Sequence, residues 1–216
     1  MAYSDFTLES AVQKLSLRMS DHVALYKSLS PVEISPMLLE VLDDQVPLAT
    51  AIHTEKARSE LIVVPILMEA RKRSGRRVGF FSGVAFDVDP ERGLNGVCDF
   101  LLSRTPIQFI LGPPVFALVE AKNDSIKGGL GQCIAEMVAA QIYNERQPPD
   151  PSVPKSSTIF GAVTTGSLWQ FLQLEGDRIQ IDRIEYGLGE VGKILAILID
   201  CLAGPIAQPP KIEGDG

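Results

Sequence analysis

The sequence contains little histidine and cysteine, which limits the chemistry available to the chain. Its only histidines are His22 and His53, which disfavours a histidine-rich metal centre or a histidine-based catalytic triad. Its three cysteines are odd in number, widely separated and embedded in apolar segments. We therefore expect reduced thiols in the core of a cytoplasmic protein, not a disulfide framework or a zinc site.

Long hydrophobic runs are also missing. The longest uninterrupted apolar stretch, residues 61–68, is far shorter than the roughly 20 residues of a membrane-spanning helix. The N-terminus lacks the basic and then apolar pattern of a secretory signal. We therefore expect no membrane partner and a cytoplasmic location. The net charge of −7 argues against strong attraction of nucleic acid to the whole surface, so any such binding must be local.

The composition is that of an ordinary globular domain: 216 residues, of which 45% are hydrophobic and 22% charged. Residues 1–75 have mainly helical patterns, and we assign residues 1–50 to a helical N-terminal extension. Helices are expected to start at Ser4–Asp5, reaching about Arg18, and at Ser35–Pro36 and Thr54. Pro65 would kink the third helix, so residues 61–67 could instead form a buried strand.

The second half of the chain alternates strand and helix patterns. A helix is expected from about residue 130 to 145, a last helix over 189–202, and a disordered tail over 207–216. The periodicity places strands at 78–86, 96–102, 115–120 and 158–164 and a hairpin at 169–174 and 178–184. The chain is therefore predicted to be α/β.

Two charged motifs lie inside apolar runs and are the most informative part of the sequence. Asp99 lies in residues 96–100, and Glu120 and Lys122 lie in residues 119–123. Alternation along a strand places Glu120 and Lys122 on one face, and the intervening spacing allows antiparallel neighbours that cluster all three groups. Two carboxylates suit a hard cation, and the ammonium could handle a phosphate or a water molecule.

The order of helix, three strands, helix and strand, with Asp on the second strand and Glu-x-Lys on the third, resembles the PD-(D/E)XK nuclease superfamily. The resemblance covers about residues 55–175. It implies a restriction-endonuclease-like mixed sheet with an α-β-β-β-α-β core, and we assign residues 51–206 to this domain, including a C-terminal hairpin and helix. Residues 54–67 are also similar to the nuclease domain of type I restriction motor subunits.

The resemblance implies a role for each residue of the motif. Asp99 and Glu120 would hold Mg²⁺, for which Mn²⁺ could substitute, with help from the backbone carbonyl of Ala121. Lys122 would orient or activate the attacking water and stabilise charge on the phosphate. Gln132, at the start of the following helix, matches a glutamine that many members place near the lysine and the scissile phosphate.

Three further positions are compared with the same superfamily. Glu60 matches a glutamate on the helix before the first strand, with Glu55 as the competing candidate; Glu60 could also be an exposed helix residue. Cys98 occupies the position of the proline in the motif. Glu136 stands where some relatives have a tyrosine four residues after the glutamine, and Gln132 and Glu136 could equally form a solvated helix edge.

The run from Arg71 to Arg77 contains five cations in seven residues. It is the one dense basic stretch, and Arg73, Arg76 and Arg77 are our candidates for contacts with a nucleic-acid backbone. The alternative is a solvated helix C-terminus, where cations are also favoured.

These observations predict a Mg²⁺-dependent endodeoxyribonuclease that hydrolyses DNA phosphodiester bonds. Its expected partner is DNA. The sequence does not decide whether the protein also forms a homodimer. The first alternative is a catalytically silent member of the same fold that binds nucleic acid or assembles with proteins. A second alternative, a small-molecule enzyme or a structural α/β protein, would leave the charged groups scattered.

Overall fold

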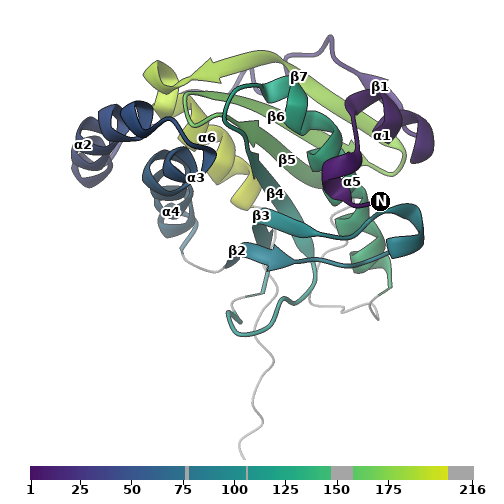
Figure 1. The fold of residues 1–216 in the computed structure, drawn as a ribbon. Coiled ribbons are helices and arrows are strands. Elements are labelled where there is room, and N and C mark those ends of the chain that lie inside the picture. Colours follow the sequence, from purple (N-terminus) through teal and green to yellow (C-terminus); the bar gives the residue numbers. More distant parts are fainter. Residues whose placement is uncertain (76–77, 106, 147–157, 204–216) are drawn as a thin grey trace, which may run out of the picture.

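A seven-stranded mixed sheet forms the centre of the protein in the computed structural model (Figure 1). The structure describes residues 1–75, 78–105, 107–146 and 158–203. The strand order is β1-β7-β6-β5-β4-β3-β2; β4–β5 and β1–β7 are parallel, and the other neighbours are antiparallel. The strands are β1 (Arg18–Ser20), β2 (Gly79–Ala85), β3 (Val97–Ser103), β4 (Val115–Ala121), β5 (Thr158–Thr164), β6 (Leu168–Glu175) and β7 (Arg178–Gly187).

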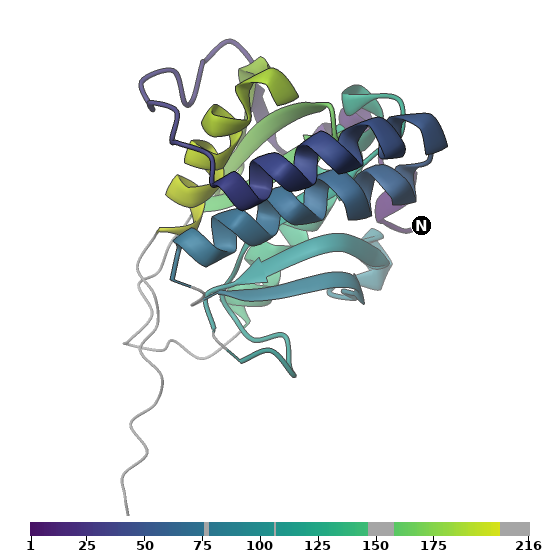
Figure 2. The same cartoon turned by 90° about the vertical axis from the view of Figure 1, so that its left-hand side faces the viewer.

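Helices cover both faces of this sheet. Figure 1 shows α1 and α5 on one side and α2, α4 and α6 on the other, and Figure 2 shows α2 lying along α4. The α/β class is thereby confirmed. The helices are α1 (Leu8–Lys14), α2 (Pro36–Ile52), α3 (Glu55–Arg58), α4 (Val64–Arg73), α5 (Ile126–Glu145) and α6 (Val191–Leu202), with a π-helical segment η2 (Ser59–Val63) and short 3-10 turns η1 (Tyr3–Asp5), η3 (Pro90–Arg92) and η4 (Leu188–Glu190).

The six strands expected from the alternating patterns are present. The largest difference is at the end of β7, which reaches Gly187 instead of residue 184. The 20-residue helix α5 begins at Ile126, earlier than expected, because the helix includes the glycines of the predicted turn. Strand β1 was not predicted, because three residues are too few to show an alternating pattern.

The expected helix starts at Ser35 and Thr54 are confirmed. The side chain of Ser35 accepts a hydrogen bond from the N–H of Leu38 at 3.3 Å, and that of Thr54 accepts one from Ala57 at 3.2 Å. The alternative of a buried strand over residues 61–67 is wrong. Pro65 lies in the first turn of α4, directly after η2, so the widened π-helical segment accommodates it without ending the helix.

The N-terminal segment differs from the expected helical extension. A helix from Ser4 to Arg18 is wrong: Thr7 and Ser10 cap α1 reciprocally, and Ser16, with φ of 56°, follows its end. Residues 18–20 then pair with β7. The proposed boundary at residue 50 falls inside α2, and η1 and α1 pack on α5 as part of the main core.

Two apolar cores fill the space between the sheet and its helical layers. One lies between the sheet and α5, and the other lies between the sheet and α4 and α6. Trp169 and Phe171 are buried in the second core, and all three cysteines are buried and free, as expected for core thiols. No helix in the described ranges combines the length and apolar character needed to cross a membrane. The predicted tail over 207–216 lies outside the described residues.

Candidate active site

Glu120 and Lys122 meet at the end of β4. Glu120 is the next-to-last residue of β4, and Lys122 is the first residue after the strand. The two residues are two positions apart, so their side chains project from the same face. Nζ of Lys122 lies 2.5 Å from Oε1 of Glu120. The prediction that these side chains share a face is confirmed. Glu120 is 1% exposed and the side chain of Lys122 is 24% exposed, so the carboxylate is shielded from water while the ammonium is partly accessible.

The first half of α5 extends this pair into a chain of hydrogen bonds. Nζ of Lys122 donates to Oε1 of Gln132 at 3.1 Å, and Nε2 of Gln132 donates to Oε1 of Glu136 at 3.1 Å. Gly129 permits the close approach, because a Cβ there would lie 3.0 Å from Cγ of Lys122. Glu136 is fully buried, so Gln132 and Glu136 do not form a solvated helix edge.

Asp99 reaches the same strand end from the neighbouring strand. The antiparallel ladder of β3 and β4 pairs Phe100 with Val119, so the next pair along it is Asp99 and Glu120. Oδ2 of Asp99 accepts a hydrogen bond from the backbone N–H of Ala121 at 2.8 Å. The predicted antiparallel neighbours are therefore present, and Asp99 is fixed beside the Glu120–Lys122 pair.

The site holds more buried carboxyl groups than its lysine could balance if all of them were ionised. Burial raises the pKa of Glu120 to about 8; the Asp99 carboxylate adds to this rise and Lys122 opposes it. Burial and the Glu120 carboxylate also hold the pKa of Glu136 well above its ordinary value. Oε2 of Glu120 and Oε2 of Glu136 are buried, and neither has a hydrogen-bond partner among the described residues. A bound cation would relieve this repulsion.

The oxygen donors available at the site limit the type of cation that it could hold. Within the described part of the chain, no three His, Cys, Asp or Glu side chains are placed to hold a metal together. Asp99 and Glu120 are two hard oxygen donors on adjacent strands. Mg²⁺ is commonly held by one or two carboxylates and keeps several waters, so this pair fits Mg²⁺ and does not fit a closed, all-protein metal cage.

The two candidate helix glutamates differ in their placement. Glu60 is exposed, and its carboxylate forms an ion pair with Lys56 at 2.8 Å. The structure therefore does not bring Glu60 into the cluster. Glu55 is close enough to act electrostatically on both Glu120 and Lys122, so it is the helix carboxylate nearer to the site.

The basic run contributes less free charge than expected. Arg73 lies at the end of α4, and its Nε is 2.8 Å from Oε1 of Glu69, a carboxylate that is 7% exposed. Nε of Arg71 donates to the backbone carbonyl of Val78. Both arginines therefore have intramolecular partners. Arg76 and Arg77, the other two candidates, lie outside the described residues.

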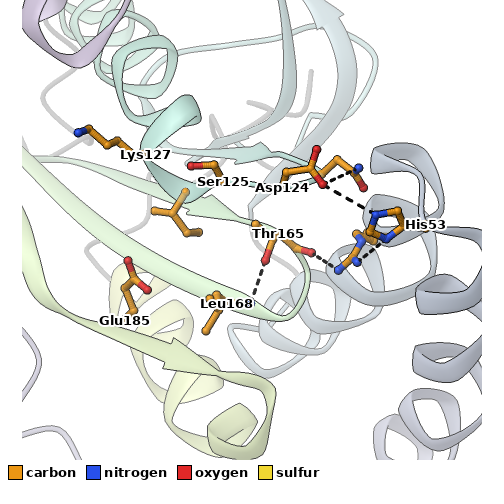
Figure 3. A pocket seen from close by; sticks show the side chains of 10 residues that line it. His53, Asp124, Ser125, Lys127, Thr165, Leu168 and Glu185 are labelled. Atoms are coloured by element: carbon orange, nitrogen blue, oxygen red, sulfur yellow. Dashed lines mark hydrogen bonds and ion pairs between the residues drawn. The ribbon is translucent and has the colours of Figure 1, made fainter.

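A pocket of about 440 Å³, which we call the Arg58 pocket, lies next to this cluster. It was not predicted, because its walls come from segments far apart in the sequence; the only local signal was the Thr54 cap, which starts the helix carrying Arg58. Figure 3 shows His53 on one side of it and Lys127 on the other. Its lining residues are His53, Arg58, Asn123, Asp124, Ser125, Ile126, Lys127, Thr165, Leu168 and Glu185.

Comparison of the sequence with protein-family models and with curated proteins found no match. The function must therefore be argued from the site.

Proposed function

We propose that the protein is a Mg²⁺-dependent nuclease that hydrolyses DNA phosphodiester bonds at the Asp99, Glu120 and Lys122 cluster. One observation carries the proposal: a lysine and two carboxylates from adjacent strands converge at one strand end, with an oxygen of Glu120 buried and free of hydrogen bonds among the described residues. Buried charged groups in this arrangement are costly for stability, which is typical of functional sites.

The topology around the site supports the same proposal. The segment from α4 to β5 has the order helix, three strands, helix and strand. β2, β3 and β4 are antiparallel neighbours, and β5 returns parallel to β4 after the crossover through α5. This order and pairing agree with the core that the resemblance to the PD-(D/E)XK superfamily implies, which supports the proposal; in that core Asp99, Glu120 and Lys122 would take the Asp and Glu-x-Lys positions.

Each residue of the cluster has a defined task in this proposal. Asp99 and Glu120 would hold the cation; when bound, Mg²⁺ supplies positive charge that offsets the phosphate charge and makes water a better nucleophile. Lys122 orients the attacking water and stabilises negative charge on the phosphate. Gln132 and Glu136 are positioning residues, because their hydrogen bonds fix the ammonium of Lys122.

The silent nuclease-fold module remains the second candidate. Lys122 and Glu120 form an ion pair with each other, and Glu120 is 1% exposed. The described residues contain no group of three side chains placed to hold a metal. A site used only for stability or assembly would keep this closed arrangement, whereas a nuclease must open it to a cation and a phosphate.

Cleavage assays on matched variants test the proposal. Purified protein should nick or degrade plasmid or oligonucleotide DNA with Mg²⁺ or Mn²⁺ and should stop when EDTA is added. Asp99→Asn and Glu120→Gln should each lower the rate by about 10² or more. Asp43→Asn, the same change at an exposed position of α2, should stay within about twofold. Absence of cleavage on single- and double-stranded DNA would support the silent module.

A further inference from the structure

The Arg58 pocket is built at the same edge of the sheet as the candidate active site. Asn123 and Asp124 follow Lys122 directly, and Thr165 follows Thr164, whose carbonyl accepts the N–H of Lys122 at 2.8 Å. The pocket therefore continues from the ends of β4 and β5, the two parallel central strands. A polymer bound at Lys122 could extend into it.

The wall of the pocket carries a buried cation that forms no ion pair with any carboxylate in the described part of the chain. Arg58 is 9% exposed. Its Nη1 donates to the carbonyl of Thr165 at 3.2 Å and to Oγ of Ser167 at 3.1 Å, while its Nε is buried and has no partner among the described residues. All of these acceptors are neutral. A buried guanidinium without a carboxylate is costly, and an anion in the pocket would compensate its charge.

His53 presents a second donor to the pocket. Its Nδ1 lies 3.1 Å from Nη2 of Arg58. Because a guanidinium only donates, Nδ1 must accept, so we assign the ring proton to Nε2. Nε2 is 3.9 Å from Oδ1 of Asp124, and Figure 3 shows these two side chains facing each other.

The start of α5 adds further positive potential. Ser125 is the N-cap of this 20-residue helix, and its side chain makes no capping hydrogen bond. Lys127 is exposed in the first turn. Free N–H groups and the dipole of a long helix favour an anion at this end, and they act here together with the uncompensated Arg58.

Two acidic residues also line the pocket, and they define how an anion would enter. The side chain of Asp124 is 77% exposed, so it can turn toward solvent and release the N–H of His53 to an incoming acceptor. Glu185 is exposed and lies away from His53 in Figure 3. Asp124 is therefore a competitor for the anion, and its charge should lower the affinity of the pocket.

We propose that the Arg58 pocket binds a phosphate group of the DNA strand, next to the phosphate that is cleaved at Lys122. Arg58, the N–H of His53 and the first turn of α5 supply the donors, and Asp124 is displaced. The choice of DNA as the source of the phosphate rests on the proposed function; the anion site itself rests on the pocket.

Proton NMR of the histidine rings measures this binding directly. The sequence has two histidines, so His53 reports on the pocket, and His22, next to Ser20 on β1, serves as the internal control. The ligands are inorganic phosphate, d(TpT) and 5′-phosphorylated d(pTpT), added without Mg²⁺ at constant pH and ionic strength. The His53 signals should shift saturably while those of His22 stay in place. Saturation by d(TpT) identifies an internal phosphate, and saturation by d(pTpT) alone identifies a terminal one.

Variants with opposite expected effects sharpen the test. Lys127→Ala should weaken phosphate binding about threefold and Asp124→Asn should tighten it by a similar factor. Both positions are exposed, so both proteins should fold. Arg58→Lys, which keeps the charge but loses the fork of donors, should weaken binding about tenfold or more. Lys27→Ala, at an exposed lysine before α2, is the matched control and should change nothing.

The inference is overturned if the His53 signals do not respond, if chloride shifts them equally, or if the Lys127 and Asp124 variants change affinity in the same direction. Its failure is distinguishable from failure of the proposed function. One such result is DNA cleavage that depends on Asp99 and Glu120 but is insensitive to Lys127→Ala, with no shift of the His53 signals on adding phosphate. That result would contradict only the phosphate site in the Arg58 pocket. Phosphate binding without any DNA cleavage would support the anion site and contradict the proposed nuclease function.

Discussion

The ammonium of Lys122, the residue directly after β4, lies 2.5 Å from the carboxylate of Glu120, and the side chain of Glu120 is 1% exposed while that of Lys122 is 24% exposed. Burial opposes the charge on the lysine, but the carboxylate of Glu120, its hydrogen bond with the ammonium, and the charges of Glu55 and Asp99 together outweigh burial and raise the pKa of Lys122. Once Glu120 has lost its proton, the pair holds a positive and a negative charge at the strand end, where a phosphate and a cation could each replace one partner.

The raised pKa of Glu120 predicts a specific pH dependence of stability. Between about pH 4.5 and 8, the unfolded chain has lost the proton of Glu120 while the folded protein retains it. The folded state then binds more protons, so the free energy of unfolding falls as pH rises, by at most about 1.4 kcal/mol per pH unit. Glu120→Gln removes this contribution.

Urea unfolding at pH 5, 6, 7 and 8 measures this contribution of Glu120 to the pH dependence of stability. The difference in stability between Glu120→Gln and the wild type should grow in favour of the variant across this range. Added Mg²⁺ should reduce the difference, because a cation favours the ionised carboxylate. Parallel curves for the two proteins would show that Glu120 is ionised throughout.

Glu136 should affect turnover through Gln132 and Lys122. Glu136→Leu removes the acceptor for Nε2 of Gln132, so the amide can rotate and Lys122 loses a fixed partner. Loss of one such hydrogen bond predicts a fall in kcat of up to about tenfold with little change in KM. Glu136→Gln keeps an acceptor oxygen and should restore most of the rate. Equal loss in both variants would contradict a positioning role.

Gly129 should be needed for the contact between α5 and the site. A Cβ at Gly129 would lie 2.6 Å from Cγ1 of Val163, so Gly129→Ala should destabilise the fold by about 1–3 kcal/mol. Gly128→Ala is the matched control on the same helix, because its Cβ would have ordinary contact with Ser125 at 3.9 Å. It should stabilise the protein by about 0.5–1 kcal/mol. Thermal unfolding of both variants tests this prediction. Similar changes in the stability of the two variants would mean that α5 can shift away from β4.

Local periodicity was enough to predict six of the seven strands of the described sheet and part of the site. Alternation along β4 placed Glu120 and Lys122 on one face, and the chain length between the two charged motifs was compatible with the antiparallel pairing that brings Asp99 alongside. These relations depend only on the two-residue repeat of a strand and on short-range connection rules.

Other features depend on tertiary packing that no local pattern encodes. The burial of Glu136 results from the close approach of α5 to the sheet, and the ion pair of Arg73 with buried Glu69 depends on how α4 packs. Arg58 meets Thr165 across 107 residues of sequence. The sequence therefore indicated the charged cluster but could not indicate which helix residues and which pocket would surround it.

The most direct test of the nuclease proposal is the single-turnover rate of Mg²⁺-dependent DNA cleavage by the wild type, Lys122→Ala and the control Lys27→Ala, with folding checked by circular dichroism. Removing the preorganised ammonium should lower the rate by about 10² or more, while Lys27→Ala cleaves like the wild type. Equal rates for folded Lys122→Ala and the wild type would contradict the assignment of the site.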